Sequence, residues 1–257
     1  MKKTLYFLSI LACPLSNFGQ SFEVAGKAKI KVMETDNTEQ DIVVRQTDGT
    51  LAVRNAATLQ NASSPATYYG SVNICCNSWM TKNLDVDVYR NGDPIPKVED
   101  GAGWAELTSG AYCYYDNDSS TYASIYGKLY NWYAVNDPRG LAPEGWHVPS
   151  DFEWTSTSEC LGGEAVAGGK MKEAGLVHWK APNAGATNVS GFEGLPGGFR
   201  SSDGTFSDIG DNSHWWSSLE YNEWNAWSRN IWFGNEYFST INDYDKVRGY
   251  SVRCLRD

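Results

Sequence analysis

An asparagine-rich stretch near the C-terminus combines aromatic rings with amide side chains, which together can bind sugars without a metal. Tryptophan and tyrosine present flat apolar faces to pyranose rings, and neighbouring asparagine side chains supply hydrogen bonds. Turn-forming residues between the rings favour loop positions, where binding residues are common. The candidate ligand-binding residues are Trp224, Asn225, Trp227, Trp232 and Tyr237. The alternative for Trp224 and Trp227 is burial in the hydrophobic core.

A metal-dependent site finds no complete ligand set in the sequence. Calcium needs about six to eight oxygen ligands, which lectin-type sites often place beside a Pro-Asn pair. Pro182-Asn183 follows Ala181 rather than an acid, and Asp116–Ser120 begins like an EF-hand loop but meets Thr121 where glycine is required. The three histidines lack the short spacings of metal sites and are interpreted as structural: His147, His178 and His214. We expect neither a metal nor a cofactor.

Catalytic motifs are absent from the sequence. It contains no Gly-x-Ser-x-Gly elbow and no phosphate-binding glycine loop. Its 31 acidic residues could include a hydrolase dyad, but spacing alone does not locate one. We therefore predict that the protein is not an enzyme.

Composition excludes several other classes of protein. Of the 257 residues, 41% are hydrophobic and only 20% charged, so the chain is neither disordered nor a coiled coil. With 21 basic and 31 acidic residues, the net charge is −10, which argues against nucleic acid and anionic membrane surfaces as partners. The expected partner is a glycan or another protein.

The N-terminus has the pattern of a signal peptide. Two lysines precede a largely apolar run, Leu5–Leu15, which is too short to span a bilayer as a helix. Cleavage after Gly19 would remove residues 1–19. The alternative is a lipoprotein that carries its lipid on Cys13. In both cases we expect export to the extracellular medium, the cell surface or the periplasm.

The cysteines then become candidates for disulfides, because an exported protein meets oxidising conditions. Five cysteines follow Cys13, so at least one is free or pairs with another chain. Adjacent Cys75 and Cys76 are unsuited to bonding each other. Because the spaced Cys-x-x-Cys pairs of zinc sites do not occur, structural disulfides are favoured over zinc.

A composition shift divides the chain, since all 11 tryptophans follow residue 78. Residues 24–60 predict a small β module with three short strands. Lysines alternate with apolar residues over 27–32, and apolar runs at 42–44 and 51–53 each follow a turn signal. So small a module buries little core, so it either packs on the larger domain or forms a homo-oligomer. Residues 61–69 are interpreted as a linker.

Residues 70–257 predict a single loop-rich α+β domain. Ser150 and Glu153 have the spacing of a capping box at a helix start, and Gly162-Gly163 would end that helix. A second helix is predicted over Gly127–Val135. Five tryptophans are assigned to the core: Trp132, Trp146, Trp154, Trp215 and Trp216.

Six motifs in this domain carry a family resemblance. They are Trp79-Met80-Thr81-Lys82-Asn83-Leu84, Gly127-Lys128-Leu129-Tyr130-Asn131-Trp132-Tyr133-Ala134-Val135, Leu141 to Ser150 with Glu153-Trp154, Gly191-Phe192 with Leu195 to Arg200, Trp215-Trp216-Ser217-Ser218, and Gly249-Tyr250-Ser251-Val252-Arg253-Cys254. In this order they resemble the Fibrobacter succinogenes major paralogous domain family of exported bacterial proteins.

That family is similar in turn to the C-type-lectin-like fold shared with formylglycine-generating enzymes, so the resemblance implies such a fold here. Those enzymes use two nearby thiols close to the C-terminus, whereas here the nearest cysteine before Cys254 is Cys160. Many relatives also carry a cysteine where this chain has Ala142. The resemblance therefore leaves Cys160 as the preferred disulfide partner of Cys254.

Together these observations predict an exported recognition module that binds a glycan or a protein without catalysis. The alternative is a structural surface protein, in which residues 24–60 oligomerise and the larger domain is displayed as a head.

Overall fold

The computed structural model describes residues 21–24, 28–31, 41–45, 51–55 and 69–257. The chain divides into two units, Met1–Thr67 and Tyr68–Asp257. The predicted signal peptide, the alternative lipid site at Cys13 and nearly all of the predicted linker lie outside the described residues.

Four strands are described in the N-terminal unit, where the sequence predicted three. Strand β1 (Ser21–Val24) pairs antiparallel with β2 (Ala28–Lys31), and β3 (Asp41–Arg45) pairs antiparallel with β4 (Leu51–Asn55). Strands β2, β3 and β4 fall at the three predicted positions, and β1 is the strand that the prediction missed.

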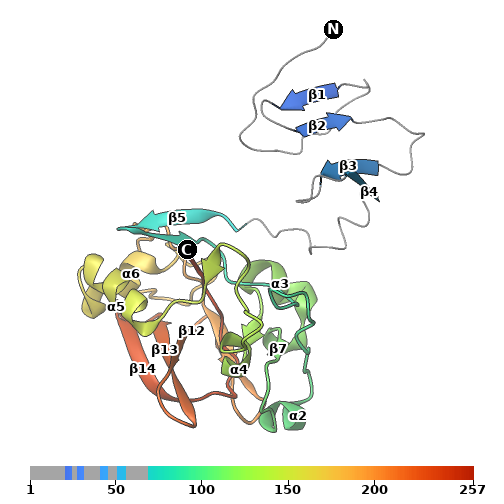
Figure 1. Cartoon of the computed structure of the whole chain (residues 1–257). Coiled ribbons are helices and arrows are strands. Elements are labelled where there is room, and N and C mark those ends of the chain that lie inside the picture. Colours follow the sequence, from blue (N-terminus) through green and yellow to red (C-terminus); the bar gives the residue numbers. More distant parts are fainter. Residues whose placement is uncertain (1–20, 25–27, 32–40, 46–50, 56–68) are drawn as a thin grey trace. The chain divides into compact units, whose positions relative to one another are not determined.

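The C-terminal unit contains both helices and strands, so its class is α+β (Figure 1). Its helices are α2 (Gly101–Ala105), the 3-10 turn η1 (Tyr115–Asn117), α3 (Ser119–Tyr126), α4 (Trp132–Val135), α5 (Asp151–Cys160) and α6 (Glu164–Met171). Its strands are β5 (Ser71–Ile74), β6 (Asn77–Met80), β7 (Tyr112–Cys113), β8 (Leu129–Tyr130), β9 (Trp146–His147), β10 (Gly197–Arg200), β11 (Phe206–Ile209), β12 (Asn212–Glu220), β13 (Asn225–Trp232), β14 (Phe238–Asp245) and β15 (Leu255–Arg256).

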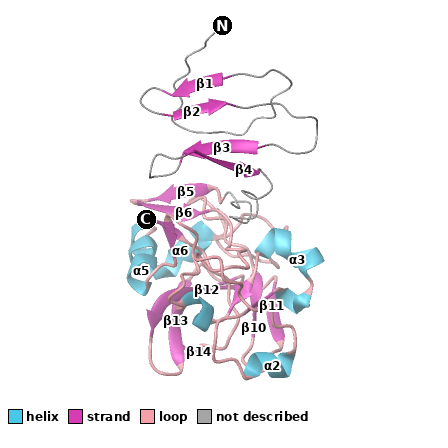
Figure 2. Cartoon of the chain, turned by 45° about the vertical axis from the view of Figure 1, so that its right-hand side comes forward, coloured by secondary structure: helices cyan, strands magenta, loops and turns pink. Residues whose placement is uncertain are grey.

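A five-stranded mixed sheet in the order β11-β10-β12-β13-β14 forms the centre of this unit (Figure 2). Strands β10 and β12 are parallel, and the other pairs are antiparallel. A second sheet, in the order β5-β6-β15-β9, joins the two ends of the domain, because Leu255 of β15 pairs with Trp79 of β6. Residues far apart in the sequence thus share one scaffold.

The large sheet is buried on both faces, which explains the adjacent tryptophans of β12. Successive residues of a strand point to opposite faces. Trp215 accordingly packs into one core cluster with Trp154 of α5, and Trp216 packs into another with Tyr250. Four of the five tryptophans assigned to the core are buried, and Trp146 packs against the core while remaining half-buried.

Helix α5 begins and ends as the sequence predicts. The Ser150 hydroxyl accepts a hydrogen bond from the N–H of Glu153, whose carboxylate accepts one from the N–H of Ser150. After Cys160 the chain leaves the helix through Gly162 and Gly163, whose φ angles of 104° and 94° favour glycine.

A buried arginine fixes α5 and α6 against the sheet. Arg229 of β13 donates from Nη2 to Asp151 Oδ1 (2.6 Å) and from Nη1 to Glu164 Oε1 (3.2 Å). The two carboxylates begin the two helices, where negative charge is also favoured by the helix dipole. One cation therefore orients both helices on the same face of the sheet.

The helix predicted over Gly127–Val135 is wrong in its first half. Leu129 and Tyr130 form strand β8, which pairs with β7, and the Tyr130 N–H also donates to the Tyr250 carbonyl (2.8 Å). The helix starts only after Asn131, whose side chain caps it by accepting the N–H of Ala134 (3.1 Å). Non-local strand pairing overrides the helical spacing of the apolar residues.

Burial of His214 predicts a loss of stability in weak acid. Its ring stacks on Tyr250 at a centroid distance of 4.7 Å, and burial lowers its pKa to about 3. Between pH 6.5 and this value the unfolded histidine binds a proton that the folded one does not, so stability falls as pH falls. The expected slope is about 1.4 kcal/mol per pH unit at most.

Urea unfolding at pH 7, 6, 5 and 4.5 measures this slope. These pH values lie above the range in which most carboxylates become protonated. The His214→Phe variant should lose it, because phenylalanine does not titrate. Equal slopes for the variant and the wild type would show that His214 is not responsible.

Candidate functional site

The five aromatic and amide residues predicted to bind ligand lie in two groups. Trp224, Asn225 and Trp227 lie at the β12–β13 turn, whereas Trp232 and Tyr237 flank the turn that leads into β14. Strand β13 has 8 residues, so its ends are about 24 Å apart. The five residues therefore do not converge on one groove.

The first group presents three rings, Tyr221, Trp224 and Trp227, which are called the aromatic turn below. The Trp224 side chain is 71% exposed and that of Tyr221 is 48% exposed. The half-buried Trp227 ring meets the Tyr221 ring edge to face, with centroids 5.1 Å apart. Tyr221 was not among the predicted residues, and it comes to Trp227 because β12 and β13 are paired.

Hydrogen bonds fix the backbone that carries these rings. The Asn222 side-chain oxygen accepts the N–H groups of Trp224 and Asn225, both at 2.8 Å. The backbone N–H of Lys246 donates to the Trp224 carbonyl (3.0 Å), and the Lys246 ammonium donates to the Glu223 carbonyl (2.8 Å). The rings are thus held on an ordered turn, which lowers the entropy cost of binding a ligand.

A buried lysine binds the backbone around the second group, Trp232 and Tyr237. The Lys172 ammonium donates to the carbonyls of Ala184 (2.7 Å), Asn235 (2.8 Å) and Trp232 (3.3 Å). Burial lowers its pKa to about 8. The Trp232 side chain is 42% exposed and Tyr237 is 52% exposed, and no ring contact between the two is found in the described part of the chain.

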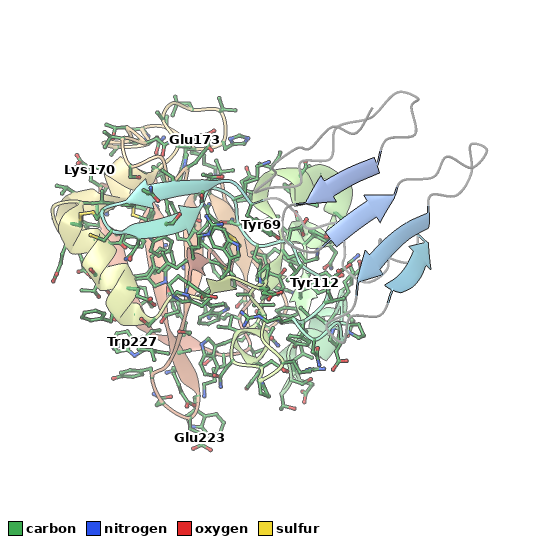
Figure 3. All side chains as sticks on the ribbon, turned by 45° about the horizontal axis from the view of Figure 1, so that its top comes forward. Tyr69, Tyr112, Lys170, Glu173, Glu223 and Trp227 are labelled. Atoms are coloured by element: carbon green, nitrogen blue, oxygen red, sulfur yellow. A yellow bond between two sulfur atoms is a disulfide. The ribbon has the colours of Figure 1, made fainter. Side chains whose placement is uncertain are left out.

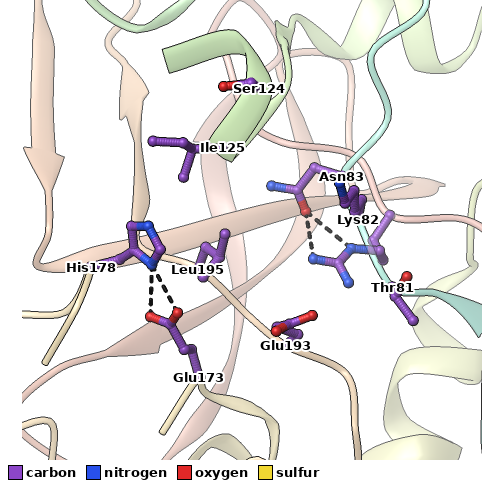
Figure 4. Close-up of a pocket in the computed structure, with 10 residues that line it drawn as sticks. Thr81, Lys82, Asn83, Ser124, Ile125, Glu173, His178, Glu193 and Leu195 are labelled. Carbon is purple, nitrogen blue, oxygen red and sulfur yellow. Dashed lines mark hydrogen bonds and ion pairs between the residues drawn. The ribbon is translucent and has the colours of Figure 1, made fainter. Parts of the chain in front are cut away.

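A pocket of about 250 Å³ opens elsewhere on the domain, and the sequence did not predict it as a site (Figure 4). Figure 3 shows Glu173, from this pocket, and Glu223, from the β12–β13 turn, at opposite ends of the domain. The lining of the pocket combines both signs of charge with small polar and aliphatic groups: Thr81, Lys82, Asn83, Ser124, Ile125, Glu173, His178, Glu193, Leu195 and Arg253.

One wall of the pocket is the buried Arg253, which is 1% exposed. Its Nε and Nη2 donate to Asn83 Oδ1 (3.0 and 2.9 Å), and its Nη1 donates to the carbonyls of Met80 (3.0 Å) and Phe192 (2.7 Å). Asn83 Oδ1 also accepts the Trp215 indole N–H (2.9 Å). Burial lowers the Arg253 pKa to about 9, so the guanidinium stays charged at neutral pH.

On the other side of the pocket, Glu173 holds His178. The His178 Nδ1 lies 2.8 and 2.9 Å from the two Glu173 carboxylate oxygens. The structural role predicted for His178 stays a prediction. Ser124 and Thr81 also line the pocket, but no hydrogen bond joins either hydroxyl to His178 within the described residues. The nucleophile–base contact of a serine hydrolase is therefore not formed here.

The predicted pairing of Cys160 with Cys254 is wrong. Cys160 bonds to Cys75, with Cα atoms 6.6 Å apart, and Cys254 is a free, buried thiol. The β5–β6 turn brings Cys75 to the end of α5, whereas Cys254 lies in the core. Burial raises the pKa of Cys254 and raises that of Cys113 to about 12, so neither thiol is activated.

The described residues contain no group of three or more His, Cys, Asp or Glu side chains placed to hold a metal ion. The Asp116–Ser120 segment instead begins a helix, because the Asp118 carboxylate accepts the N–H of Thr121 (3.1 Å) at the start of α3. Among the described helices, none has the length and apolar character needed to cross a membrane.

A family model described as the Fibrobacter succinogenes major domain matches residues 72–256. The chain belongs to this family. Neither a curated protein nor a solved structure matches it. In this Fibrobacter succinogenes major domain, motif residues that are distant in sequence meet beside the pocket, where Arg253 donates hydrogen bonds to the side chain of Asn83 and to the carbonyl of Phe192.

Proposed function

We propose that this protein is an exported, non-catalytic recognition module that binds a glycan through the aromatic turn. The observation that carries the proposal is the exposure of the Trp224 ring, 71%, on a turn fixed by hydrogen bonds. Large exposed aromatic side chains held in this way are typical of binding surfaces. We further propose that the domain has a C-type-lectin-like fold, as the family resemblance implies.

The chemistry around the rings supports a glycan as the ligand. Tyr221 and Trp227 extend the apolar surface beside Trp224, and Asn222, Asn225 and the exposed Glu223 surround it with polar groups. Pyranose rings offer both an apolar face and a rim of hydroxyls, so they match this combination. The raised pKa values of the buried thiols support a role without thiol catalysis.

Export is supported by the Cys75–Cys160 disulfide, because such bonds persist mainly outside the cytosol. We propose the extracellular medium, the cell surface or the periplasm as the location. The two lysines and the apolar run at the N-terminus of the sequence are the second support for this proposal.

Replacing Trp224 with alanine should weaken glycan binding by about tenfold or more, because tryptophan side chains that a ligand covers are frequent binding hot spots. The exposed side chain contributes little to folding, so the midpoint of thermal unfolding should stay nearly constant. Glycan-array screening of the full chain identifies a ligand, and calorimetric titration compares the two proteins.

Trp232→Ala is the matched control, because it removes a second exposed tryptophan from the opposite end of β13. Its affinity should equal that of the wild type. Loss of binding in Trp232→Ala with full binding in Trp224→Ala would place the site at the other end of the strand and contradict the proposal.

The alternative function is structural, and the N-terminal strands favour it. They form two separate two-stranded sheets, β1-β2 and β3-β4, and such sheets are only marginally stable by themselves. Association between copies of residues 24–60 would stabilise them. A stable trimer or polymer in light scattering, combined with no binding to any glycan, would favour this alternative.

A further inference from the structure

The pocket beside Arg253 has a lining that the glycan proposal does not use. Its volume of about 250 Å³ suits one small molecule, and it lies away from the aromatic turn (Figures 3 and 4). We propose that this pocket binds a small zwitterion of the α-amino acid class, with its carboxylate toward Arg253 and Lys82 and its ammonium toward Glu173 and Glu193.

Arg253 offers an unused donor to the carboxylate of such a ligand. A guanidinium has five N–H groups, and the four hydrogen bonds to Asn83, Met80 and Phe192 use four of them. The remaining N–H is on Nη2 and has no partner among the described residues, although the side chain is 1% exposed and lines the pocket. Leaving a buried donor without a partner is unfavourable, so a ligand oxygen that accepts this N–H would stabilise the complex.

Lys82 adds a second positive charge to the same side. It is exposed, and it forms no ion pair with any described residue. In Figure 4, Lys82 and Asn83 lie together on the side opposite the His178–Glu173 pair. A ligand carboxylate would thus meet one buried and one exposed cation, and the hydrogen bonds would be charge-assisted.

Two carboxylates form the complementary part of the lining. Among the described residues, the Glu173 carboxylate pairs with the His178 N–H alone, so its two oxygens retain lone pairs that an ammonium can use. Glu193 lies between the two sides in Figure 4 and forms no ion pair in the described part of the chain. Its backbone is held at a φ of 58°, where its N–H donates to Asn188 Oδ1 (2.9 Å). Such uncommon backbone geometry is frequent at binding sites.

The balance of charge selects the ligand class. The charges of Arg253 and Lys82 balance those of Glu173 and Glu193, so a ligand with a single charge gains from one side and is repelled by the other. A zwitterion pairs with both sides. A neutral sugar would leave the lining charges without ionic partners, and the lining residues include no tryptophan, tyrosine or phenylalanine to stack on a pyranose ring. Ile125 and Leu195 also line the pocket and supply apolar contacts for a small apolar side chain.

Calorimetric titration of the full chain tests this inference with three molecules that share the same branched four-carbon unit. L-valine carries both charges, isovalerate lacks the ammonium, and isobutylamine lacks the carboxylate. L-valine should bind, and each of the other two should bind about tenfold more weakly or less. A failure of L-valine to bind in the millimolar range, or equal binding of isovalerate or isobutylamine, would overturn the proposal.

Two variants locate the binding. Glu173→Gln keeps an oxygen for His178 but removes the charge. Lys82→Gln removes the charge of an exposed side chain. Each variant should bind L-valine about tenfold more weakly. Glu159→Gln, which removes an exposed carboxylate from α5, is the matched control and should bind normally. Unchanged binding in Lys82→Gln and Glu173→Gln would exclude this pocket as the site.

Discussion

Replacing Arg253 with methionine is expected to lower the free energy of unfolding by about 3–5 kcal/mol, because it removes several buried hydrogen bonds from a charged group, each worth about 1.5–3 kcal/mol. The variant leaves Asn83 Oδ1 with one donor instead of three, and it leaves the carbonyls of Met80 and Phe192 without the guanidinium. Buried acceptors that lose their partners are costly. Urea unfolding at pH 7 measures the difference.

Arg256→Met is the matched control for this variant. Arg256 lies three residues further along the chain and is exposed, so its replacement should change stability by less than about 0.5 kcal/mol. Arg253→Lys should also be destabilised, because an ammonium cannot reproduce the planar fork that reaches Asn83, Met80 and Phe192 together. Wild-type stability in Arg253→Met would show that this cluster does not hold the two ends of the domain together.

The second large effect is expected from the disulfide. Serine at both Cys75 and Cys160 should lower the free energy of unfolding by about 2–5 kcal/mol, because the bond restricts the unfolded chain over a long loop. The two cysteines are separated by 85 residues, which places the loss near the upper end of this range. Chemical unfolding under non-reducing conditions measures it.

Cys76 provides a close control for the disulfide. Its thiol is free and exposed beside Cys75, so Cys76→Ser should be as stable as the wild type. Peptide mapping without reduction should recover Cys75 linked to Cys160. Recovery of Cys160 linked to Cys254, or an equal loss of stability in Cys76→Ser, would contradict the pairing.

The features that the sequence predicted well depend on neighbouring residues. Ser150 and Glu153 form the capping box within one turn of helix, and Gly162 and Gly163 end that helix as expected. The family could also be predicted from the sequence, because the assignment depends on the motifs and their order. Burial of Trp154 follows from its size and its place on a capped helix.

The features that the sequence predicted poorly depend on contacts between distant segments. Leu129 and Tyr130 have helical spacing, yet they form a strand because β7 and Tyr250 lie beside them. The partner of Cys160 is set by the position of the β5–β6 turn, which no local pattern encodes. In both cases the tertiary neighbours outweigh the local preference.

The two candidate sites differ in the same way. The aromatic turn could be predicted in part, because Trp224 and Trp227 lie in a turn-rich stretch of the sequence. Tyr221 joins them only through strand pairing. The pocket was missed because Glu173 and Glu193 lie outside any motif. Arg253 lies inside the closing motif, and an arginine among the buried residues of that motif is the signal that would have indicated a buried polar cluster.

The most direct test of glycan recognition by the aromatic turn is NMR titration of the full chain, observing the indole N–H signals while an array-identified glycan is added. The signals of Trp224 and Trp227 should shift most, and that of Trp232 should stay nearly constant. Saturating glycan that leaves the Trp224 and Trp227 signals unchanged while shifting others would contradict the proposed site.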